Sequence, residues 1–324
     1  SFRFDIEIEA DLIEEIGRVY GYENIPDDYT SGRLKMLALP ETKRPRFAVY
    51  NEMAARGYRE VVSYAFVDEQ WEQDFAANTN PIRLQNPLAA QYAVMRSTLI
   101  GGLVEVLQNN LNRKQNRVRV FEIARVFSKD SADQFVQNER IGGLWYGSVL
   151  PEQWGEKTRN VDFYDMKADV ESLLKSKEVS FVKTEHPALH PGRAANIVSD
   201  GRVVGFVGEL HPKWLQKYDL PQAPLVFEID MDAVLGREKT RYQSVSKFQP
   251  ARRDLAFVMP EAVTHDDLLN VLKAAANKLV QEISVFDVYR GTGVPEGMKS
   301  VAVKIILQDM ENTLTDEVIE PLVA

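Results

Sequence analysis

The chain has 324 residues, of which 44% are hydrophobic and 27% are charged, and its formal net charge is −9. These values are ordinary for a water-soluble globular protein and leave room for roughly two domains. The lack of cysteine excludes disulfides, thiolate metal ligands and a cysteine nucleophile. No apolar run approaches the ~20 residues of a membrane helix, and no basic-then-apolar leader opens the chain, so we expect a cytoplasmic protein without a membrane partner.

The first 25 residues look like the end of a larger domain. Alternation over Ser1–Ile8 predicts a strand, and the apolar spacing over Asp11–Tyr20 predicts a short helix. A chain that opens on a strand suggests a fragment. Residues 26–40 are expected to form a connector.

Residues 41 to about 241 mix helices and strands in a way that is typical of a largely antiparallel α+β sheet. The predicted helices are Arg46–Arg56, Leu99–Arg113 and Tyr164–Leu174. The predicted strands are Glu60–Phe66, Arg117–Phe127, Arg140–Tyr146, Ala195–Val198, Val203–Glu209 and Leu225–Asp230.

From Phe248 onward the predicted order is β-α-β-β-α. Its elements are a strand over Arg253–Met259, a helix capped by Thr264, strands over Ile283–Arg290 and Ser300–Gln308, and a helix capped by Thr315. This is the ferredoxin-like order without its final strand, which is a second indication of truncation.

Several strings, in this order, resemble the β-subunit family of bacterial phenylalanyl-tRNA synthetases. The end of that family's metal-bearing domain is similar to RFDIEIEADLIEEIGRVYGYENIP. Its class II synthetase-like core is similar to MRSTLIGGLVEVLQNNLNRKQNRVRVFEIARVF, HPALHPGRAANI and GFVGELHP. Its ferredoxin-fold anticodon-binding domain is similar to FQPARRDLAFVM, FDVYRGTGVPEGMKSVAVKIILQD and TLTDE. The implied domains are residues 1–25, 26–245 and 246–324.

The resemblance implies a C-terminal part of a β subunit in an (αβ)2 heterotetramer that joins phenylalanine to its tRNA with ATP. The α subunit would hold the active site, so we expect no catalytic residue in this chain. The editing domain would precede residue 1, so we expect no proofreading. The expected roles are to scaffold the α subunit, help hold Mg2+ and bind the tRNA anticodon. The alternative is a stand-alone synthetase paralogue with a regulatory or amino-acid-sensing role.

Four carboxylates near the N-terminus are candidate metal ligands. Asp11, Glu14 and Glu15 share one helix face, and Asp5 precedes them. Without a nearby cation they repel one another, and such oxygen ligands suit Mg2+. The residues alone favour another interpretation, with Asp11 as an N-cap and acidic groups facing the helix dipole. The resemblance implies instead a magnesium site shared with the α subunit.

The core lacks the arginines that adenylation needs. The motif-two-like stretch spans residues 121–127, and Ser128 occupies the position where the resemblance implies an arginine. Arg125, within the stretch, is still able to reach a ligand. The motif-three-like stretch at 227–232 carries acids, which repel phosphate. We therefore expect a relic core. The helix Arg46–Arg56 resembles motif one, and is either a dimerisation element against the α subunit and a symmetry mate or an internal core helix.

The remaining candidates are histidines and an RNA-facing surface. His186, His190 and His211 each precede a proline, so we expect hydrogen-bonding loop residues and no helical metal pair. In the last unit, basic and aromatic side chains on the open sheet face and around the glycine-rich loop suit unstacked anticodon bases. The predicted tRNA contacts are Arg252, Tyr289, Arg290, Lys299 and Lys304.

The competing interpretation of those five is ordinary solvated charge. From residue 246 on, 8 Lys and Arg stand against 12 Asp and Glu, a balance of −4. We therefore do not expect this unit alone to bind RNA tightly. We expect it to contribute through avidity within the assembly.

Overall fold

The computed structural model describes residues 3–29, 31–33, 40–130, 132–174 and 178–323. The chain forms two compact units, residues 1–239 and 240–324. Each unit has a hydrophobic core of its own. Within the described part of the chain, every helix is too short or too polar to cross a bilayer.

The N-terminal segment forms helix α1 (Glu9–Tyr20) and a 3-10 turn, η1 (Tyr22–Asn24). No strand occurs over the described residues 3–8, so the predicted strand is wrong there, and Ser1 and Phe2 lie outside the described residues. An extended segment becomes a β-strand only if a neighbouring strand pairs with its backbone hydrogen-bonding groups. Its backbone amides at Glu7 and Ile8 instead donate to the Asp11 carboxylate. Residues 34–39 of the predicted connector also lie outside the described residues.

The large sheet of the first unit has, within the described residues, the strand order β1-β4-β5-β9-β8-β7-β6. β1 is parallel to β4, and every other neighbouring pair is antiparallel. The prediction of a largely antiparallel α+β core is therefore confirmed. The bounds are β1 Arg59–Glu60, β4 Val118–Lys129, β5 Phe135–Tyr146, β6 Val179–Lys183, β7 Leu189–Ser199, β8 Arg202–Leu210 and β9 Leu225–Asp230.

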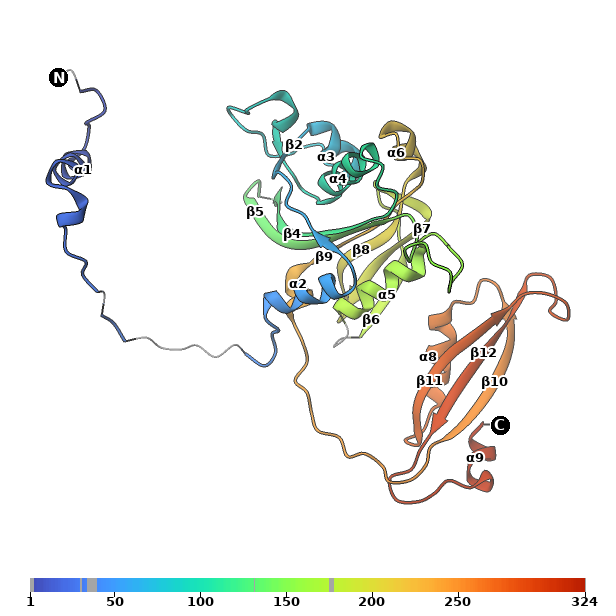
Figure 1. The fold of residues 1–324 in the computed structure, drawn as a ribbon. Coiled ribbons are helices and arrows are strands. Elements are labelled where there is room, and N and C mark those ends of the chain that lie inside the picture. The colour runs from blue at the N-terminus through green and yellow to red at the C-terminus, as the bar shows by residue number, and fades with distance from the viewer. Residues whose placement is uncertain (1–2, 30, 34–39, 131, 175–177, 324) are drawn as a thin grey trace. The chain divides into compact units, whose positions relative to one another are not determined.

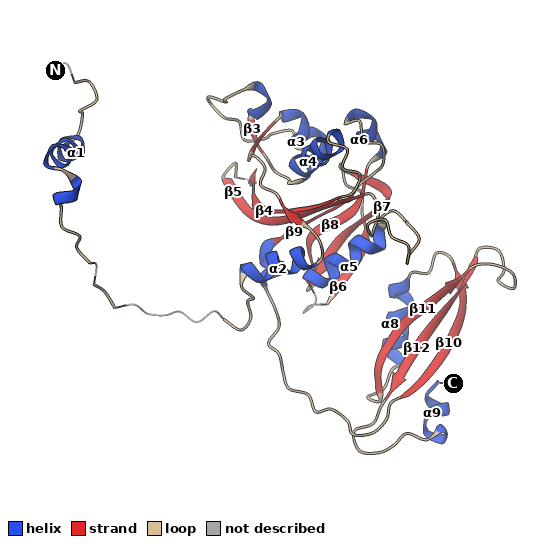
Figure 2. Ribbon diagram, in the orientation of Figure 1, coloured by secondary structure: helices blue, strands red, loops and turns tan. Residues whose placement is uncertain are grey.

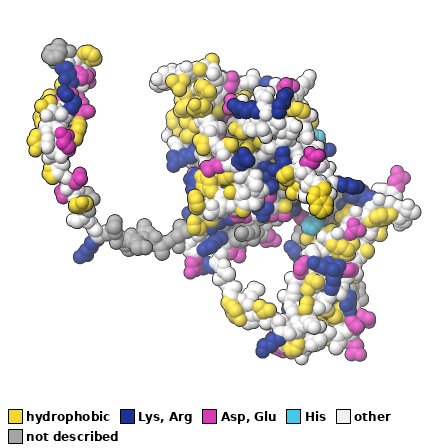
Figure 3. Space-filling view, in the orientation of Figure 1, with side chains coloured by type: hydrophobic (Ala, Val, Ile, Leu, Met, Phe, Trp, Pro, Cys, Tyr) yellow, Lys and Arg dark blue, Asp and Glu magenta, His cyan; other side chains and the backbone are white. Residues whose placement is uncertain are grey.

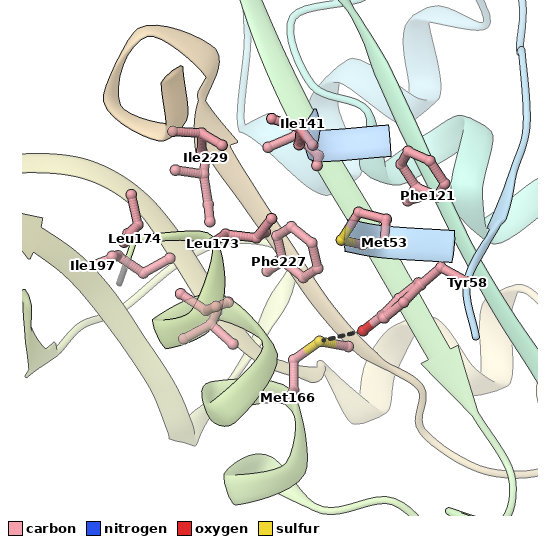
Figure 4. Close-up of a cluster of buried hydrophobic side chains, with 14 of the residues drawn as sticks. Met53, Tyr58, Phe121, Ile141, Met166, Leu173, Leu174, Ile197, Phe227 and Ile229 are labelled. Carbon is pink, nitrogen blue, oxygen red and sulfur yellow. Dashed lines mark hydrogen bonds between the residues drawn. The ribbon is translucent and has the colours of Figure 1, made fainter. Parts of the chain in front are cut away.

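Helices cover both faces of the large sheet (Figure 2). On one face lie α2 (Arg46–Ala55), α5 (Phe163–Leu173) and α7 (Met231–Leu235), and on the other α3 (Glu69–Ala76), α4 (Ile100–Asn112) and α6 (Pro212–Lys217). Side chains on the α2 face point toward one another, among them Met53, Tyr58 and Phe227 (Figure 4). In this core the Tyr58 hydroxyl donates to the Asp169 carboxylate at 2.8 Å and lies 3.4 Å from the Met166 sulfur.

Several elements of the first unit differ from the prediction. The predicted strand Glu60–Phe66 is divided between β1 and a separate short strand, β2 (Phe66–Val67), which pairs with β3 (Val94–Met95). α3, α6, α7 and β6 were not predicted. β7 begins at Leu189, six residues before the prediction, because a register shift between Leu189 and Ala194 accommodates Pro191 and Gly192.

The second unit has the order β10 (Ala251–Pro260), α8 (His265–Ala275), β11 (Val280–Tyr289), β12 (Met298–Leu307), α9 (Asp316–Val323). Its described strands form a small antiparallel sheet in the order β10-β12-β11 (Figure 1). The predicted ferredoxin-like βαββα order is confirmed. Thr264 caps α8 as predicted, since its hydroxyl accepts from the Asp267 amide at 3.1 Å. The buried row on β12 comprises Val301, Val303, Ile305 and Leu307.

Candidate functional site

The carboxylates near the N-terminus are held by arginines. Arg3 donates to Asp5 at 2.7 and 2.9 Å and lies 3.2 Å from Glu15, and Arg18 donates to Glu15 at 2.7 Å. These hydrogen bonds lower the pKa of both Asp5 and Glu15 to about 2. The expectation of four carboxylates without a nearby cation is therefore wrong. Among the described residues, no three acidic or histidine side chains lie close enough together to hold a metal ion.

Asp11 has the capping role that the residues alone favoured, but at a different position. Ile8 is the N-cap of α1, and Asp11, the third helical residue, accepts a hydrogen bond from the N-cap amide. Its carboxylate accepts from the amides of Glu7 at 2.7 Å and Ile8 at 2.9 Å, and these bonds lower its pKa. The oxygen chemistry of Asp5, Asp11, Glu14 and Glu15 suits Mg2+. Their arrangement in this structure does not form a cage for the ion.

A buried carboxylate on β9 organises the α4 face of the large sheet. Glu228 accepts from Thr98 at 2.6 Å, from the Leu99 amide at 2.8 Å and from Arg140 at 2.6 Å, and its side chain is fully buried. The amide bond lies at the N-terminus of α4, where the helix dipole favours a negative charge. Gly142 lies opposite Glu228, and a Cβ there would come within 3.1 Å of Leu99. The missing side chain lets α4 approach the sheet.

A second buried ion pair, between Arg96 and Glu122 of β4, lies at the same sheet. Glu122 accepts from Arg96 at 3.0 Å and from the Ser63 hydroxyl at 2.6 Å, and all but about a twentieth of the Arg96 and Glu122 side-chain surface is buried. Arg125 donates to Gln137 at 3.2 Å. Arg96 and Arg125 therefore both donate hydrogen bonds to other residues of the protein.

The space left beside these pairs is small. A hollow of about 150 Å³ is lined in part by Arg140, Phe206, Glu228 and Asp230. Sites for drug-sized ligands usually occupy roughly 300–1,000 Å³. This hollow is too small for a nucleotide, and its two carboxylates would repel a phosphate.

A larger hollow, of about 590 Å³, lies on the α2 face of the large sheet. Its arginines have protein partners: Arg44 donates to Glu52 at 2.7 Å, and Arg56 donates to the buried Asp169 at 2.8 Å. α2 itself buries Val49 and Met53, whereas Phe47 is 72% exposed. The internal packing expected of a core helix is therefore present, and the ring of Phe47 lies outside that packing.

The histidines form three similar turns. The Nδ1 atoms of His186, His190 and His211 each accept a hydrogen bond from the amide two residues later, at 3.2, 3.0 and 3.0 Å. The predicted hydrogen-bonding role is confirmed, but His190 lies within β7 and His211 is the N-cap of α6, so only His186 is an ordinary loop residue. His186 also packs on Phe206, with 4.0 Å between ring centroids, and burial lowers its pKa to about 4.

The small sheet has one covered face and one open face. Cross-strand pairing places Arg252, Asp254 and Lys304 on the open face, as predicted. Tyr289 pairs with Ser300 and shares that face. Lys299 falls on the covered side, in line with Val301, and its ammonium donates to the carbonyls of Glu261 and Val263 at 3.1 and 2.7 Å. Of the five predicted tRNA contacts, Lys299 is therefore turned away from the open face.

Each of the other predicted cations is paired with a carboxylate. Arg252 donates to Asp254 at 2.8 and 2.9 Å, and Lys304 lies 2.9 Å from Glu282. Arg290 donates to Glu261 through two nitrogens, at 2.5 and 3.0 Å. These pairs lower the pKa of Asp254, Glu261 and Glu282. In the space-filling view, basic and acidic side chains of this unit lie among hydrophobic ones (Figure 3).

Phe286 is an open-face residue that the prediction missed. Its ring lies 5.4 Å from the Arg252 guanidinium carbon and is 52% exposed. Ile283 and Val285 face the core, so strict alternation already points Phe286 outward. A register shift between Val285 and Asp287 then brings Tyr289 to the same face. Two exposed aromatic rings on one strand are the surface on which unstacked bases can stack.

Comparison with known proteins gives consistent matches along the chain. The family described as "Phenylalanyl tRNA synthetase beta chain CLM domain" matches residues 25–231, "Ferredoxin-fold anticodon binding domain" matches 246–324, and "tRNA synthetase B5 domain" matches 1–22. Two relatives named "Phenylalanine--tRNA ligase beta subunit" are 88% identical (Neisseria meningitidis, 323 residues) and 56% identical (Chromobacterium violaceum, 321 residues).

These matches cover 100% and 99% of this chain, which spans 41% of each of the two relatives. A solved pyrrolysyl tRNA synthetase from Desulfitobacterium hafniense is 10% identical, with a TM-score of 0.43 over 59% of this chain and 66% of that one.

Proposed function

Because the chain belongs to the phenylalanyl tRNA synthetase β-chain family, we propose that it is a non-catalytic part of a phenylalanine–tRNA ligase. The complete enzyme would convert ATP, phenylalanine and tRNA to phenylalanyl-tRNA in the cytoplasm. This chain would work in an (αβ)2 heterotetramer whose α subunit performs the chemistry. The proposed domains are residues 1–25, 26–245 and 246–324.

The observation that carries this proposal is the open face of the small sheet. Tyr289 and Phe286 expose their rings on it, and Arg252 and Lys304 stand beside them. Single-stranded RNA loops are read by such stacking surfaces with cations nearby. Residues 246–324 match the ferredoxin-fold anticodon-binding family, which agrees with this chemistry. The proposed ligand of this face is the anticodon region of the tRNA.

The charge pairs of the large sheet support the absence of adenylation in this chain. Arg140 and Arg96 are bound by Glu228 and Glu122, so neither is available to neutralise the phosphates of ATP. The core would instead be a scaffold for the α subunit. The exposed Phe47 on α2 is the residue we assign to that contact.

A magnesium ion shared with the α subunit is also proposed, with Asp5, Asp11, Glu14 and Glu15 as the source of oxygen ligands. These residues do not form a cage in this structure, because Arg3 bonds to Asp5 and Glu15. Binding of the ion would require Arg3 to leave both carboxylates. The acidic character of the segment supports the proposal, and a partner's ligands would complete the site.

The proposal is tested by co-purifying the complete β chain with its α chain and comparing it with a variant that ends at residue 245. We expect phenylalanine-dependent ATP–pyrophosphate exchange in both complexes and weaker tRNA binding and charging in the shortened one. Equal tRNA affinity in the two complexes would contradict an anticodon role for residues 246–324. Failure of the complete β chain to associate with the α chain would favour a stand-alone regulatory paralogue.

A further inference from the structure

The small hollow beside Glu228 is lined by side chains from four neighbouring strands of the large sheet. Strand pairing sets Arg140 opposite Asp230, and Phe206 opposite both Glu228 and Asn196. Side chains that are paired across strands or are two residues apart share a sheet face, so these five side chains share one face. The hollow measures about 150 Å³. Because a water molecule occupies roughly 30 Å³, it has room for about five water-sized groups.

The charged groups of this lining do not balance. Arg140 donates to the fully buried Glu228 at 2.6 Å, and its Nε atom lies 3.2 Å from a carboxylate oxygen of Asp230, which is about a third exposed. Two carboxylates therefore share one guanidinium, and an excess negative charge remains. A simple anion that enters the hollow is repelled by that charge.

The lining also contains polar atoms that the fold leaves unused. The Nε atom of Arg140 is buried and makes no hydrogen bond to any residue that the structure describes. A buried donor without an acceptor is costly. Asp230 is the N-cap of α7, yet its carboxylate makes no capping hydrogen bond. Asn196 adds an amide, which can both donate and accept. The hollow thus presents an unused donor beside unused acceptors.

We propose that this hollow binds a small amino acid of about the size of glycine as its zwitterion. The carboxylate of the ligand would accept from Arg140 and Asn196, and its ammonium group would donate to Asp230. Glycine has about five non-hydrogen atoms, which matches the available room. A simple amine would leave the Nε atom of Arg140 unpaired, and a simple anion would meet the excess negative charge. Only a ligand that carries both charges satisfies the two conditions.

The ligand class is tested by saturation-transfer NMR of the purified chain with glycine, methylamine and acetate in separate titrations. We expect glycine to reach half-saturation on the order of 1 mM, since a ligand of this size makes few contacts. Methylamine and acetate should bind at least about tenfold more weakly, because each lacks one set of charged hydrogen bonds. Phenylalanine, which is more than twice as large as glycine, should not displace it.

Two variants test the location of the site. Asp230→Asn keeps the side-chain volume and removes the charge, so we expect it to weaken glycine binding about tenfold or more. Val203→Trp should block the hollow and leave its charges in place, because Val203 lines the hollow and is 54% exposed. Asp232→Asn is the matched control, since it makes the same change on the exposed side of α7, outside the lining. Near-UV circular dichroism checks that each variant is folded.

The outcomes decide the inference without reference to tRNA or the α subunit. Glycine binding that Asp230→Asn and Val203→Trp weaken and Asp232→Asn leaves unchanged would support the site. No saturation by glycine below about 50 mM would overturn it, as would wild-type affinity in both lining variants. Equal affinity for glycine and either single-charge probe would refute recognition of a zwitterion. The ligase proposal stands or falls separately, by the co-purification and charging assays.

Discussion

Glu228 accepts a hydrogen bond from Thr98 at 2.6 Å across a separation of 130 residues in the chain. The bond joins β9 to the residues that precede α4, and Arg140 on β5 completes the neutralisation of the carboxylate. Glu228 therefore links two strands of the large sheet, β9 and β5, to the start of helix α4. The carboxylate thus satisfies the buried hydroxyl of Thr98 and the Leu99 amide at the start of α4.

We predict that Glu228→Ala lowers the free energy of unfolding of this chain by about 3–5 kcal/mol, because it removes the buried acceptor of Thr98 and the Leu99 amide and leaves Arg140 with only the more exposed Asp230. Adding Arg140→Ala should recover part of the loss. Urea unfolding followed by tryptophan fluorescence measures both. Glu209→Ala is the control, since its partner Arg193 is mostly exposed and its loss should cost no more than about 1 kcal/mol. Equal losses for the two single variants would argue against the buried network.

We predict that the chain on its own shows no phenylalanine-dependent ATP–pyrophosphate exchange. Arg96 and Arg140 are held by carboxylates, and the hollow of about 150 Å³ beside Glu228 is too small for a nucleotide. The assay needs the assembled αβ complex as a positive control. Exchange by the purified chain above the level of a heat-inactivated sample would show that an adenylation site exists here.

We predict a pH-dependent contribution from His186. The unfolded chain takes up a proton on this histidine below about pH 6.5, whereas burial lowers the pKa in the folded protein to about 4. The stabilisation is thus complete above pH 6.5 and is lost as the pH falls toward 4, by up to roughly 3 kcal/mol. His186→Asn keeps an acceptor for the Ala188 amide and should flatten the decline over this window. Parallel stability profiles for wild type and variant would refute the assignment.

We predict different salt behaviour for Tyr289→Ala and Arg290→Ala in the assembled enzyme. Loss of the Tyr289 ring should cost roughly 1–3 kcal/mol of tRNA binding at every salt concentration. Loss of Arg290 should lower the salt slope by at most about one unit, because Glu261 already neutralises part of its charge. Filter binding across a salt series measures both quantities. If neither variant changes tRNA affinity, the RNA contacts a different surface.

We predict that Arg3 competes with Mg2+ for the N-terminal carboxylates. Arg3→Ala should raise the affinity of the αβ complex for Mg2+, measured by isothermal titration, because Asp5 loses its arginine partner and Glu15 keeps only Arg18. Asp11→Ala combined with Glu15→Ala should weaken association with the α chain and remove its dependence on Mg2+. A double variant that assembles normally and ignores a chelator would leave Asp11 with a capping role alone.

The elements that carry a strong periodic pattern were predictable from the sequence. α2, α4, α5, β9 and the whole βαββα unit follow from apolar spacing and from the Thr264 cap. The turn role of the three histidines followed from the prolines behind them. Such features depend on neighbours in the chain, which a single sequence contains.

The sequence was less informative where distant residues decide. Arg3 binds a carboxylate twelve positions away, and this cation partner of Glu15 does not follow from local spacing. Pairing with Ser300 through a register shift, and not alternation, turns Tyr289 to the open face. Lys299 lies near the loop in the sequence, but its strand position turns it toward the covered side, where it donates to the carbonyls of Glu261 and Val263.

The short first strand has a consequence for aggregation. β1 is one edge of the large sheet and consists of Arg59 and Glu60, both exposed. An edge of two charged residues offers a passing chain very little backbone to pair with, whereas a long apolar edge would invite strand addition. At the other edge, β6 has five residues and ends in Lys183. Lengthening β1 with β-branched residues would therefore create an edge on which strands of other molecules pair.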